Sequence, residues 1–468
     1  MTVAEATPEL DLYDAEDTSF LGHPKGLGYL AFTEAWERFS FYGMQALLVL
    51  YMVNYLLLPG PVSEVAGIEQ LRSLYGGLEG QAFASAIFGT YAACVYLTPI
   101  FGGLLADRLL GKRRTVLLGA VTMALGHFLM AFNVTFLLAL LCLILGSGMF
   151  KGNISSQVGN LYRPDDLRRA DAFQIFYLGI NAGVIASPLV VGTLGETMGW
   201  HWGFGAAGVG MVIGLIIYVA GQKYLPREHF DVPGRKTASE AKDPMNRTDW
   251  LATIALLLLI PVLAVAIVPN NQIFNAYLVW GDQSFALYWG EEKLPTTWLI
   301  TLDAVVSVSF LAIVAGFYRW WKTKWTEPDE LSKIIIGSLF SIGGMGCLYL
   351  AAATTPAGEK IGLFWPVMFH IVNSIGFAHM LPVSLALFAR LAPKQISGTV
   401  IGLYFIAFFL GNSMVGYVGG WFETMPVTQF WLMHMGFAAS AGAVFVLFKL
   451  LLAPRLMHSA KPEDAALA

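Results

Sequence analysis

The sequence predicts an all-α membrane protein with twelve transmembrane helices in two groups of six. Of its 468 residues, 56% are hydrophobic and only 13% are charged, with a net charge of -4. A soluble globular domain rarely shows this balance. Apolar stretches long enough to cross a hydrocarbon core about 30 Å thick recur along the whole chain. Lys and Arg also gather in alternate loops, as expected of a polytopic membrane protein.

Each predicted span is a largely apolar stretch of about 20 residues or more. The first six cover residues 27–57, 81–109, 115–136, 138–158, 171–195 and 202–218. The second six cover residues 250–289, 297–318, 331–353, 364–391, 397–422 and 430–452.

The seventh stretch, residues 250–289, is too long for one straight crossing and is interrupted by the sequence PNNQIFN. It is therefore one broken helix or two spans. Basic residues decide between these, because they cluster after spans two, four, six, eight and ten only if this stretch crosses once. We therefore predict a long, broken seventh helix and place both chain termini in the cytoplasm.

The predicted organisation follows from these spans. We expect a cytoplasmic tail over residues 1–26, a helix bundle over 27–222, a basic cytoplasmic loop over 223–248, a second bundle over 249–453 and a tail over 454–468. The acidic N-terminal segment does not resemble a signal peptide, and three isolated cysteines do not indicate disulfides or zinc. This layout is typical of the major facilitator fold, in which the substrate lies between two six-helix bundles.

The end of the second span carries a charged loop, ADRLLGKRR, after the pair Gly102 and Gly103. The glycines permit close helix packing. The loop resembles the cytoplasmic loop of major facilitator transporters, which implies a gating role for Asp107, Arg108 and Arg113. Alternatively, the cluster sets topology and caps a helix.

The first span contains three ionisable residues, Glu34, Glu37 and Arg38. Each costs at least ~2.5 kcal/mol at the centre of a membrane helix, so such residues normally face the bundle interior and mark an ion or substrate path. Their spacing places them on one helix face, which Tyr42 continues. A carboxylate beside a guanidinium can release it on protonation, which suits proton-coupled recognition of an anionic group. The alternative is a permanently paired ion pair that only orients the helix.

Three stretches resemble the proton-dependent oligopeptide transporter family. EAWERFSFYGM is similar to its first-helix motif, GSGMFKGNISSQVGNLY to its fourth helix with a buried lysine, and RRADAFQIFYLGINAG to its F-Y-x-x-I-N-x-G block, which ends here at Gly183. The three stretches stand in the family's order and spacing. The resemblance implies import of di- and tripeptides with protons by alternating access.

The resemblance also implies roles for individual residues. Glu34, Glu37 and Arg38 would form the proton and carboxylate switch, and Lys151 would be a second cation for the peptide carboxylate. For Lys151, snorkelling towards the interface is the alternative. The residues expected to form hydrogen bonds to the peptide are Tyr42, Tyr96 and Asn181.

The second half departs from the family pattern. Asp282 stands where the seventh helix usually has Glu, and we expect it to bind a proton or the peptide amino group. Phe377 replaces the usual tenth-helix Glu, and Tyr404 replaces a substrate-lining Trp. Gln45 replaces an arginine, which removes the expected partner of the acid on the seventh helix.

Two further ionisable residues lie in the second half. Asp303 is a lone carboxylate in the eighth span, for which we expect a pore-facing role. By contrast, His370 is interpreted as an interfacial or packing residue, like His127 and His201.

The predicted function is therefore a proton-coupled di- and tripeptide symporter. An alternative is a transporter of the same fold for another anion such as nitrate. An enzyme or a channel is not favoured, because no hydrolase, metalloprotease or filter-like motif is present. We expect a monomer in the cell (cytoplasmic) membrane, with protons as coupling ion, no cofactor and no nucleic-acid partner.

Overall fold

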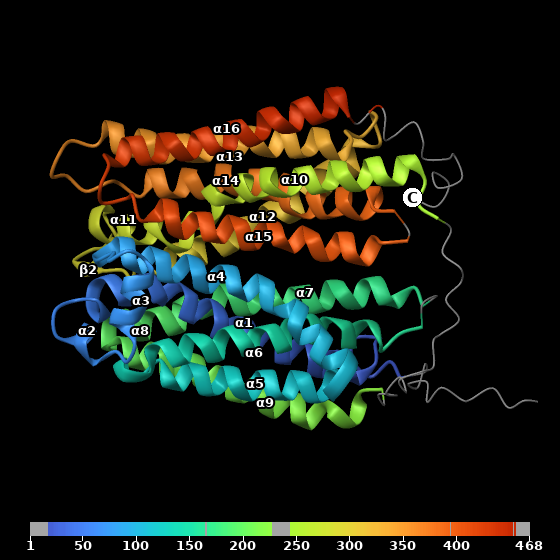
Figure 1. The fold of residues 1–468 in the computed structure, drawn as a ribbon, viewed down its shortest axis with the longest axis horizontal. Coiled ribbons are helices and arrows are strands. Elements are labelled where there is room, and N and C mark those ends of the chain that lie inside the picture. Colours follow the sequence, from blue (N-terminus) through green and yellow to red (C-terminus); the bar gives the residue numbers. More distant parts are fainter. Residues whose placement is uncertain (1–16, 164–165, 227–243, 394, 453, 455–468) are drawn as a thin grey trace, which may run out of the picture. The chain divides into compact units, whose positions relative to one another are not determined.

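The computed structural model describes residues 17–163, 166–226, 244–393, 395–452 and 454, and almost all of its ordered elements are helices (Figure 1). The chain forms two compact units. Unit 1 comprises Met1–Met44 and Thr98–Lys236, and unit 2 comprises Gln45–Leu97 and Thr237–Ala468. Most of the predicted N-terminal tail, interdomain loop and C-terminal tail lies outside the described residues. The predicted domain boundaries therefore stay predictions.

Unit 1 is built from the first part of α1 and the helices that follow residue 97. The α-helices are α1 (Lys25–Tyr51), the end of α4 (Gly80–Leu105), α5 (Lys112–Leu129), α6 (Phe136–Gly159), α7 (Arg168–Ser187), α8 (Thr193–Met198) and α9 (Trp200–Gly221). Short turns of other helix types are η2 (Ala106–Leu110), η3 (Asn133–Thr135), η4 (Pro188–Gly192) and η5 (Gln222–Tyr224). α5 packs along both α6 and α9 (Figure 1).

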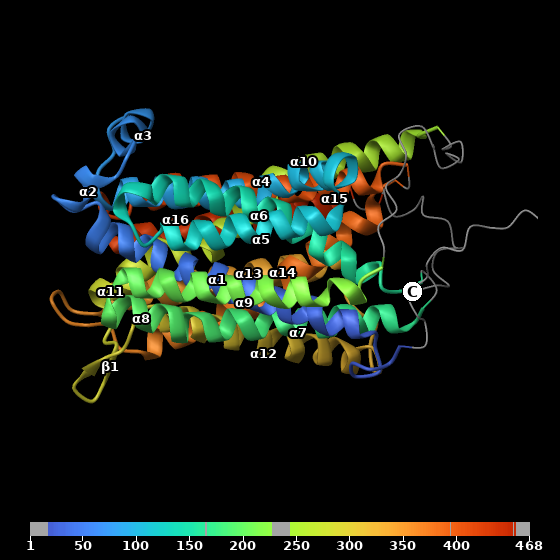
Figure 2. The ribbon, with the colours of Figure 1, turned by 90° about the horizontal axis from the view of Figure 1, so that it is seen from below.

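Unit 2 contains the end of α1, most of α4 and the C-terminal helices. Its elements are η1 (Met52–Leu56), α2 (Pro61–Glu64), α3 (Ile68–Leu74), α10 (Arg247–Asn271), η6 (Gln272–Phe274), α11 (Ala276–Ser284), β1 (Tyr288–Trp289), β2 (Glu292–Lys293), α12 (Trp298–Trp321), α13 (Glu330–Thr354), α14 (Phe364–Leu391), α15 (Ser397–Gly419) and α16 (Val427–Leu451). α13 packs between α14 and α16. The short helices α2 and α3 and the β1–β2 hairpin lie at one end of the unit (Figures 1 and 2).

Eleven helical segments of the described chain are long and apolar enough to span a membrane. They coincide with eleven of the twelve predicted spans. The remaining predicted span corresponds to α5, which has 18 residues and begins with Lys112, Arg113 and Arg114. Because of these three charges, α5 is less apolar than the other eleven segments and is not counted among them. Its length still agrees with the prediction of twelve spans.

The seventh span starts at α10 and has the predicted break at its other end. At the start of α10 is a capping box, in which the Asn246 side chain accepts a hydrogen bond from the Asp249 backbone and the Asp249 carboxylate accepts one from the Asn246 backbone. Pro269 lies near its end, and η6 separates α10 from α11. The predicted end at Trp289 is wrong, because α11 stops at Ser284 and Trp289 belongs to β1.

Side-chain amides stabilise this break by contacting neighbouring helices. Asn270 accepts a hydrogen bond from Asn373 of α14 at 2.8 Å, and Asn271 donates to Asn412 of α15 at 3.1 Å. Asn275 accepts a hydrogen bond from Ser85 of α4 at 2.9 Å. Irregular backbone at membrane depth requires such partners, since lipid offers none.

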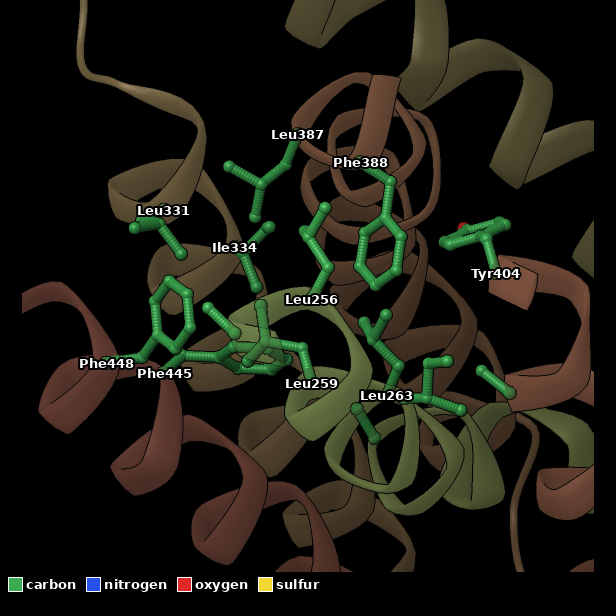
Figure 3. Packing of buried hydrophobic residues seen from close by; sticks show 14 of the residues in the cluster. Leu256, Leu259, Leu263, Leu331, Ile334, Leu387, Phe388, Tyr404, Phe445 and Phe448 are labelled. Atoms are coloured by element: carbon green, nitrogen blue, oxygen red, sulfur yellow. The ribbon is translucent and has the colours of Figure 1, made fainter. Parts of the chain in front are cut away.

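Apolar packing in unit 2 is concentrated where α10, α13, α14, α15 and α16 meet (Figure 3). Leu256, Leu259 and Leu263 of α10 pack in one cluster with Phe388 of α14 and Phe445 of α16. Lipid tails are as apolar as these side chains, so close van der Waals contact rather than the hydrophobic effect stabilises the cluster.

Glycine explains one close helix crossing in unit 1. A Cβ on Gly102 of α4 would collide with the backbone carbonyl oxygen of Gly148 on α6. Gly103, in contrast, has no heavy atom within 4 Å of its Cβ position. The predicted role in close packing is therefore correct for Gly102 and wrong for Gly103. The Gly102 contact brings α6 against α4 three residues before Lys151.

Candidate functional site

The first-helix charges form a buried group on α1. The Oε1 atom of Glu34 lies 2.8 Å from Nε and 2.7 Å from an Nη atom of Arg38. Oε2 of Glu37 lies 3.1 Å from the same Nε. The exposed fractions are 1% for Glu34, 0% for Glu37 and 12% for Arg38. One guanidinium thus faces two carboxylates, as the spacing predicted.

The two carboxylates are not held equally. The single N–H at Nε of Arg38 donates to Glu34, so the approach of Glu37 is an ion pair without a well-aligned hydrogen bond. Neither oxygen of Glu37 has a hydrogen-bond partner among the described residues. An ionised carboxylate in this environment is costly. Glu37 is therefore the carboxylate that Arg38 holds less firmly.

Lys151 of α6 supplies the second cation. Its ammonium lies 3.7 Å from the centre of the Phe41 ring, a cation–π contact. With the four side chains in their ordinary charged forms, Glu34, Glu37, Arg38 and Lys151 carry no net charge. We call these four residues the first-helix cluster. Because the Lys151 ammonium rests on a ring rather than a carboxylate, it is available to an incoming anion.

Glycines bring α7 against α1 beside this cluster. A Cβ on Gly183 would collide with the backbone carbonyl oxygen of Ala35, and its next neighbour would be Cβ of Arg38, at 3.0 Å. Gly179 approaches the carbonyl oxygen of Ala31 in the same way, at 2.9 Å. The Ser187 hydroxyl then donates to the Phe39 carbonyl. The glycine that ends the INAG sequence thus has a physical reason in the packing of the cluster.

Two other predicted substrate residues lie in unit 1. Tyr42 is partly buried and follows Arg38 by one turn of α1. Asn181 of α7 is also partly buried, but its amide nitrogen donates to the carbonyl oxygen of Tyr177 on its own helix, at 2.8 Å. The described contacts do not bring the Asn181 amide nitrogen to the cluster.

Asp282 has a cation partner outside the first helix. Its Oδ1 atom lies 2.8 Å from the Lys293 ammonium of β2 and accepts a hydrogen bond from Thr296 at 3.0 Å, and its Oδ2 atom accepts one from Asn54 at 2.9 Å. The hairpin after α11 thus returns a lysine to the acid, in place of the arginine that Gln45 replaces. Lys293 is 53% exposed, so this pair lies close to water.

The predicted substrate residues Tyr96 and Tyr404 both pack against Phe408. Tyr96 stacks on Phe408, with ring centres 4.9 Å apart, and Tyr404 meets the same ring edge-on. Tyr404 is only 3% exposed and its hydroxyl lies 3.0 Å from that of Ser384. It belongs to the apolar cluster of unit 2 (Figure 3). This geometry gives no support to a substrate contact by Tyr404.

Asp303 is not the lone carboxylate that the sequence indicated. Its Oδ1 atom lies 2.9 Å from Nδ1 of His370 on α14. Nε2 of His370 lies 2.9 Å from the hydroxyl of Tyr277 on α11. The interpretation of His370 as a packing residue is therefore incomplete, since its ring links a carboxylate to a phenol. No sequence motif signals this contact between residues 67 positions apart.

The predicted gate residues lie at the end of α4. Asp107 and Arg108 are exposed on η2, and no ion pair joins Asp107 to a described residue. Arg113 instead donates to the carbonyl oxygens of Leu225 and Pro226. Arg113 thus fastens the end of η5 to α5 within unit 1. The gating role of these residues stays a prediction.

The loop before α7 holds a local ion pair. Arg168 donates from its side chain and its backbone to Asp166, and these hydrogen bonds hold the pKa of the Asp166 carboxyl below its usual range. Both side chains are partly exposed. The pair orders the start of α7 rather than forming part of the cluster.

No group of His, Cys, Asp and Glu that could hold a metal ion occurs within the described ranges. The three cysteines are free thiols. The arrangement can bind anionic groups and exchange protons. A multi-pass membrane protein with buried, charge-balanced helices of this kind belongs to the class of membrane transporters.

Comparisons with known proteins identify the family. A sequence model of the POT family matches residues 113–232. The chain is 30% identical to the peptide transporter YePEPT of Yersinia enterocolitica, covering 86% of this chain and 88% of that protein. It is 31% identical to a di-/tripeptide transporter of Lactococcus lactis, covering 84% and 88%. The chain belongs to the POT family.

Solved structures agree with this assignment. The crystal structure of a peptide transporter POT in complex with sulfate has a TM-score of 0.79 and 26% identity, covering 94% of this chain and 96% of that chain. A variant of such a transporter in complex with alafosfalin has a TM-score of 0.80 and 27% identity over the same shares. The predicted major facilitator fold is confirmed, and the family is one of transporters.

Proposed function

We propose that this chain is a proton-coupled symporter that imports di- and tripeptides by alternating access. The observation that carries the proposal is the first-helix cluster, in which two buried carboxylates share one guanidinium while an ammonium rests on a ring. The names of its relatives, which include a peptide transporter and a di-/tripeptide transporter, agree with it.

The peptide carboxylate is the natural ligand for the two cations. Arg38 can present a fork of N–H groups to it, and Lys151 a point charge. No carboxylate of the described residues forms an ion pair with the Lys151 ammonium, so a peptide carboxylate displaces none there. At Arg38, the peptide carboxylate needs only to displace the weaker contact with Glu37. Glu34 keeps Arg38 in place through its two short contacts.

Charge balance then couples the peptide to a proton. The cluster is neutral before the peptide arrives, and an added carboxylate gives it a charge of -1. An uncompensated charge in an apolar environment is costly. A proton on Glu37 restores neutrality, so peptide carboxylate and proton stabilise each other's binding. Neither is favoured alone, which is the requirement for symport.

Other parts of the proposal follow from the sequence. Tyr42, Asn181 and Tyr96 remain candidates for hydrogen bonds to the peptide backbone. The coupling ion is the proton and no cofactor is needed. We infer a monomer in the cell membrane with both termini in the cytoplasm, from the distribution of basic loop residues and the absence of a predicted oligomeric pore.

Uptake into liposomes tests the proposal. Purified protein would be reconstituted and supplied with labelled dialanine under an inward proton gradient. We expect accumulation that collapses with the gradient and is blocked by an unlabelled tripeptide but not by glucose or nitrate. Accumulation without a proton gradient would contradict coupling. Competition by nitrate alone would contradict the substrate class and favour another anion.

A further inference from the structure

We propose that Asp303 and His370, together with Tyr277, form a second proton-binding site, located in unit 2. This inference rests on the proposed function in so far as the bound proton is transported. The three side chains come from α12, α14 and α11, and each is within hydrogen-bond distance of the next, at 2.9 Å in both cases. We call this group the histidine relay.

The relay is enclosed but not sealed. His370 is fully buried, as is Tyr277, whereas Asp303 is 18% exposed. Asp303 and His370 lie in the second turns of α12 and α14, at the end of unit 2 that carries the β1–β2 hairpin (Figure 1). Part of the Asp303 carboxylate therefore remains exposed, while the imidazole is enclosed by protein.

The hydrogen bonds allow the relay to gain a proton without any heavy atom moving. In the neutral imidazole, Nδ1–H donates to the Asp303 carboxylate, and Nε2 accepts from the Tyr277 hydroxyl. A proton added at Nε2 turns that nitrogen into a donor. The Tyr277 oxygen can then accept instead, because a hydroxyl both donates and accepts. Protonation also changes the charge of the relay from -1 to zero.

Three other buried histidines of the long helices differ from His370 in their partners. His379 on the same helix contacts the Tyr318 hydroxyl at 3.0 Å and donates to the Ile375 carbonyl, at 2.8 Å. His434 donates to the Phe430 carbonyl, and His127 has no described hydrogen-bond partner. Charging any of these would bury a lone cation. Of these four, His370 is the one with a carboxylate within hydrogen-bond distance.

The other charged side chains of the described part of unit 2 are paired, exposed or at the opposite ends of their helices. Asp282 is already paired with Lys293, and the Lys360 ammonium donates to the Gln283 carbonyl. Glu291, Glu292 and Glu359 in the same loops are exposed. The helices that pack against α14 carry their other charged residues at the opposite end, which are Arg247 and Asp249 on α10, Arg319 on α12, and Glu330 and Lys333 on α13. The remaining titratable groups on these helices and on α14 are Tyr318, Cys347, Tyr349, His379, Arg390, Tyr404 and Tyr417.

The position of the relay on α14 adds a second argument. The carboxylate expected at residue 377 is absent, since that residue is Phe377. His370 precedes it by seven residues, two helix turns, and so lies on the same face of α14. The face of α14 that lacks the expected carboxylate at residue 377 thus carries the imidazole of His370, which contacts the carboxylate of Asp303 on α12. The relay supplies an ionisable group where the sequence seemed to have lost one.

Proton stoichiometry in liposomes tests the transport role. The ratio of protons to dialanine would be determined from the membrane potential at which net flux reverses, for the unmodified protein, Asp303→Asn and His370→Gln. We expect both variants to exchange labelled for unlabelled dialanine while the ratio falls by about one. His379→Gln, which removes the matched histidine without a carboxylate, should keep the original ratio. An unchanged ratio in both relay variants would overturn the transport role.

Nitrogen-15 NMR of histidine-labelled protein in lipid separates this inference from the proposed function. Subtracting the spectrum of His370→Gln assigns the His370 signals. We expect its Nε2 signal to change from imidazole to imidazolium as the medium is acidified, and this change to disappear in Asp303→Asn. A His370 signal that stays constant would overturn the proton site, whatever the transport result. If the unmodified protein failed to accumulate dialanine, the proposed function would fail while this spectrum still decided the site.

Discussion

The first-helix cluster and the histidine relay hold carboxylates in apolar helices by opposite means. In the cluster, the counter-charge of Arg38 is permanent, because a guanidinium stays protonated in proteins. Within the pairs that Arg38 forms, a proton can therefore be gained only by a carboxylate. In the relay, the counter-charge of Asp303 is conditional, because the imidazole of His370 can be neutral or charged. The comparison shows that the basic partner of a buried carboxylate determines which group takes up a proton. A permanently charged partner leaves this to the carboxylate, whereas a neutral imidazole can take up the proton itself.

The largest expected effect comes from replacing the permanent charge. Arg38→Lys should reduce gradient-driven uptake of dialanine by more than tenfold, because a point cation cannot hold Glu34 and a substrate carboxylate in the forked geometry. Arg72→Lys, in the exposed pair with Glu69 on α3, is the matched control and should retain activity. A fully active Arg38→Lys would remove the argument from geometry.

Glu37→Gln separates the two functions of the cluster. This variant carries a permanent neutral side chain in place of the protonated acid, so uptake driven by a pH gradient should be lost. Counterflow of labelled against unlabelled dialanine should continue in part, since exchange requires the binding site but no net proton movement. Equal loss of both activities would indicate that Glu37 binds the substrate or supports the structure.

Gly183→Ala should disturb the cluster through its backbone and leave every charge in place. The new methyl group would collide with the carbonyl oxygen of Ala35, which cannot move away as a side chain would. Overpacking of this kind costs about 1–3 kcal/mol. We expect a lower midpoint of thermal unfolding and reduced uptake. Gly205→Ala on α9, where no atom lies within 4 Å, should change neither, and an equal effect there would contradict this explanation.

The smallest effect is expected for the exposed pair of unit 2. Lys293→Gln removes the cation beside Asp282, but pairs close to water contribute only about 0–1 kcal/mol. Dialanine uptake should therefore change by a few-fold at most. A tenfold loss would show that Asp282 takes part in proton coupling through this lysine, and would add a third ionisable site to the comparison.

The sequence predicted one half of this comparison and not the other. Glu34, Glu37 and Arg38 lie within one helical turn, so their meeting follows from helix geometry alone. The contact of Asp303 with His370 depends on how α12 packs against α14, which no local pattern encodes. The same reason hides the pairing of Asp282 with Lys293, because a two-residue hairpin reverses the chain between them.

The spans were more predictable than their ends. Apolar length fixed eleven helices, since the bilayer imposes one thickness on all of them. The end of the seventh span was missed because Trp289 and its neighbours are as apolar as a helix interior, although they form a strand. The burial of Tyr404 could likewise not be predicted, since the sequence alone does not distinguish an aromatic residue of a packed core from one that lines a binding site.

The break between α10 and α11 has a mechanical consequence for unit 2. Amides of Asn270, Asn271 and Asn275 attach this point of the chain to α14, α15 and α4 respectively. α10 cannot slide or turn about its axis without breaking several of these bonds at once. The hydrogen bonds at the break therefore fix the rotation of α10 about its own axis relative to its neighbours in unit 2. An apolar helix without such amides could slide along its neighbours, whereas α10 has to move together with the helices to which these amides are hydrogen-bonded.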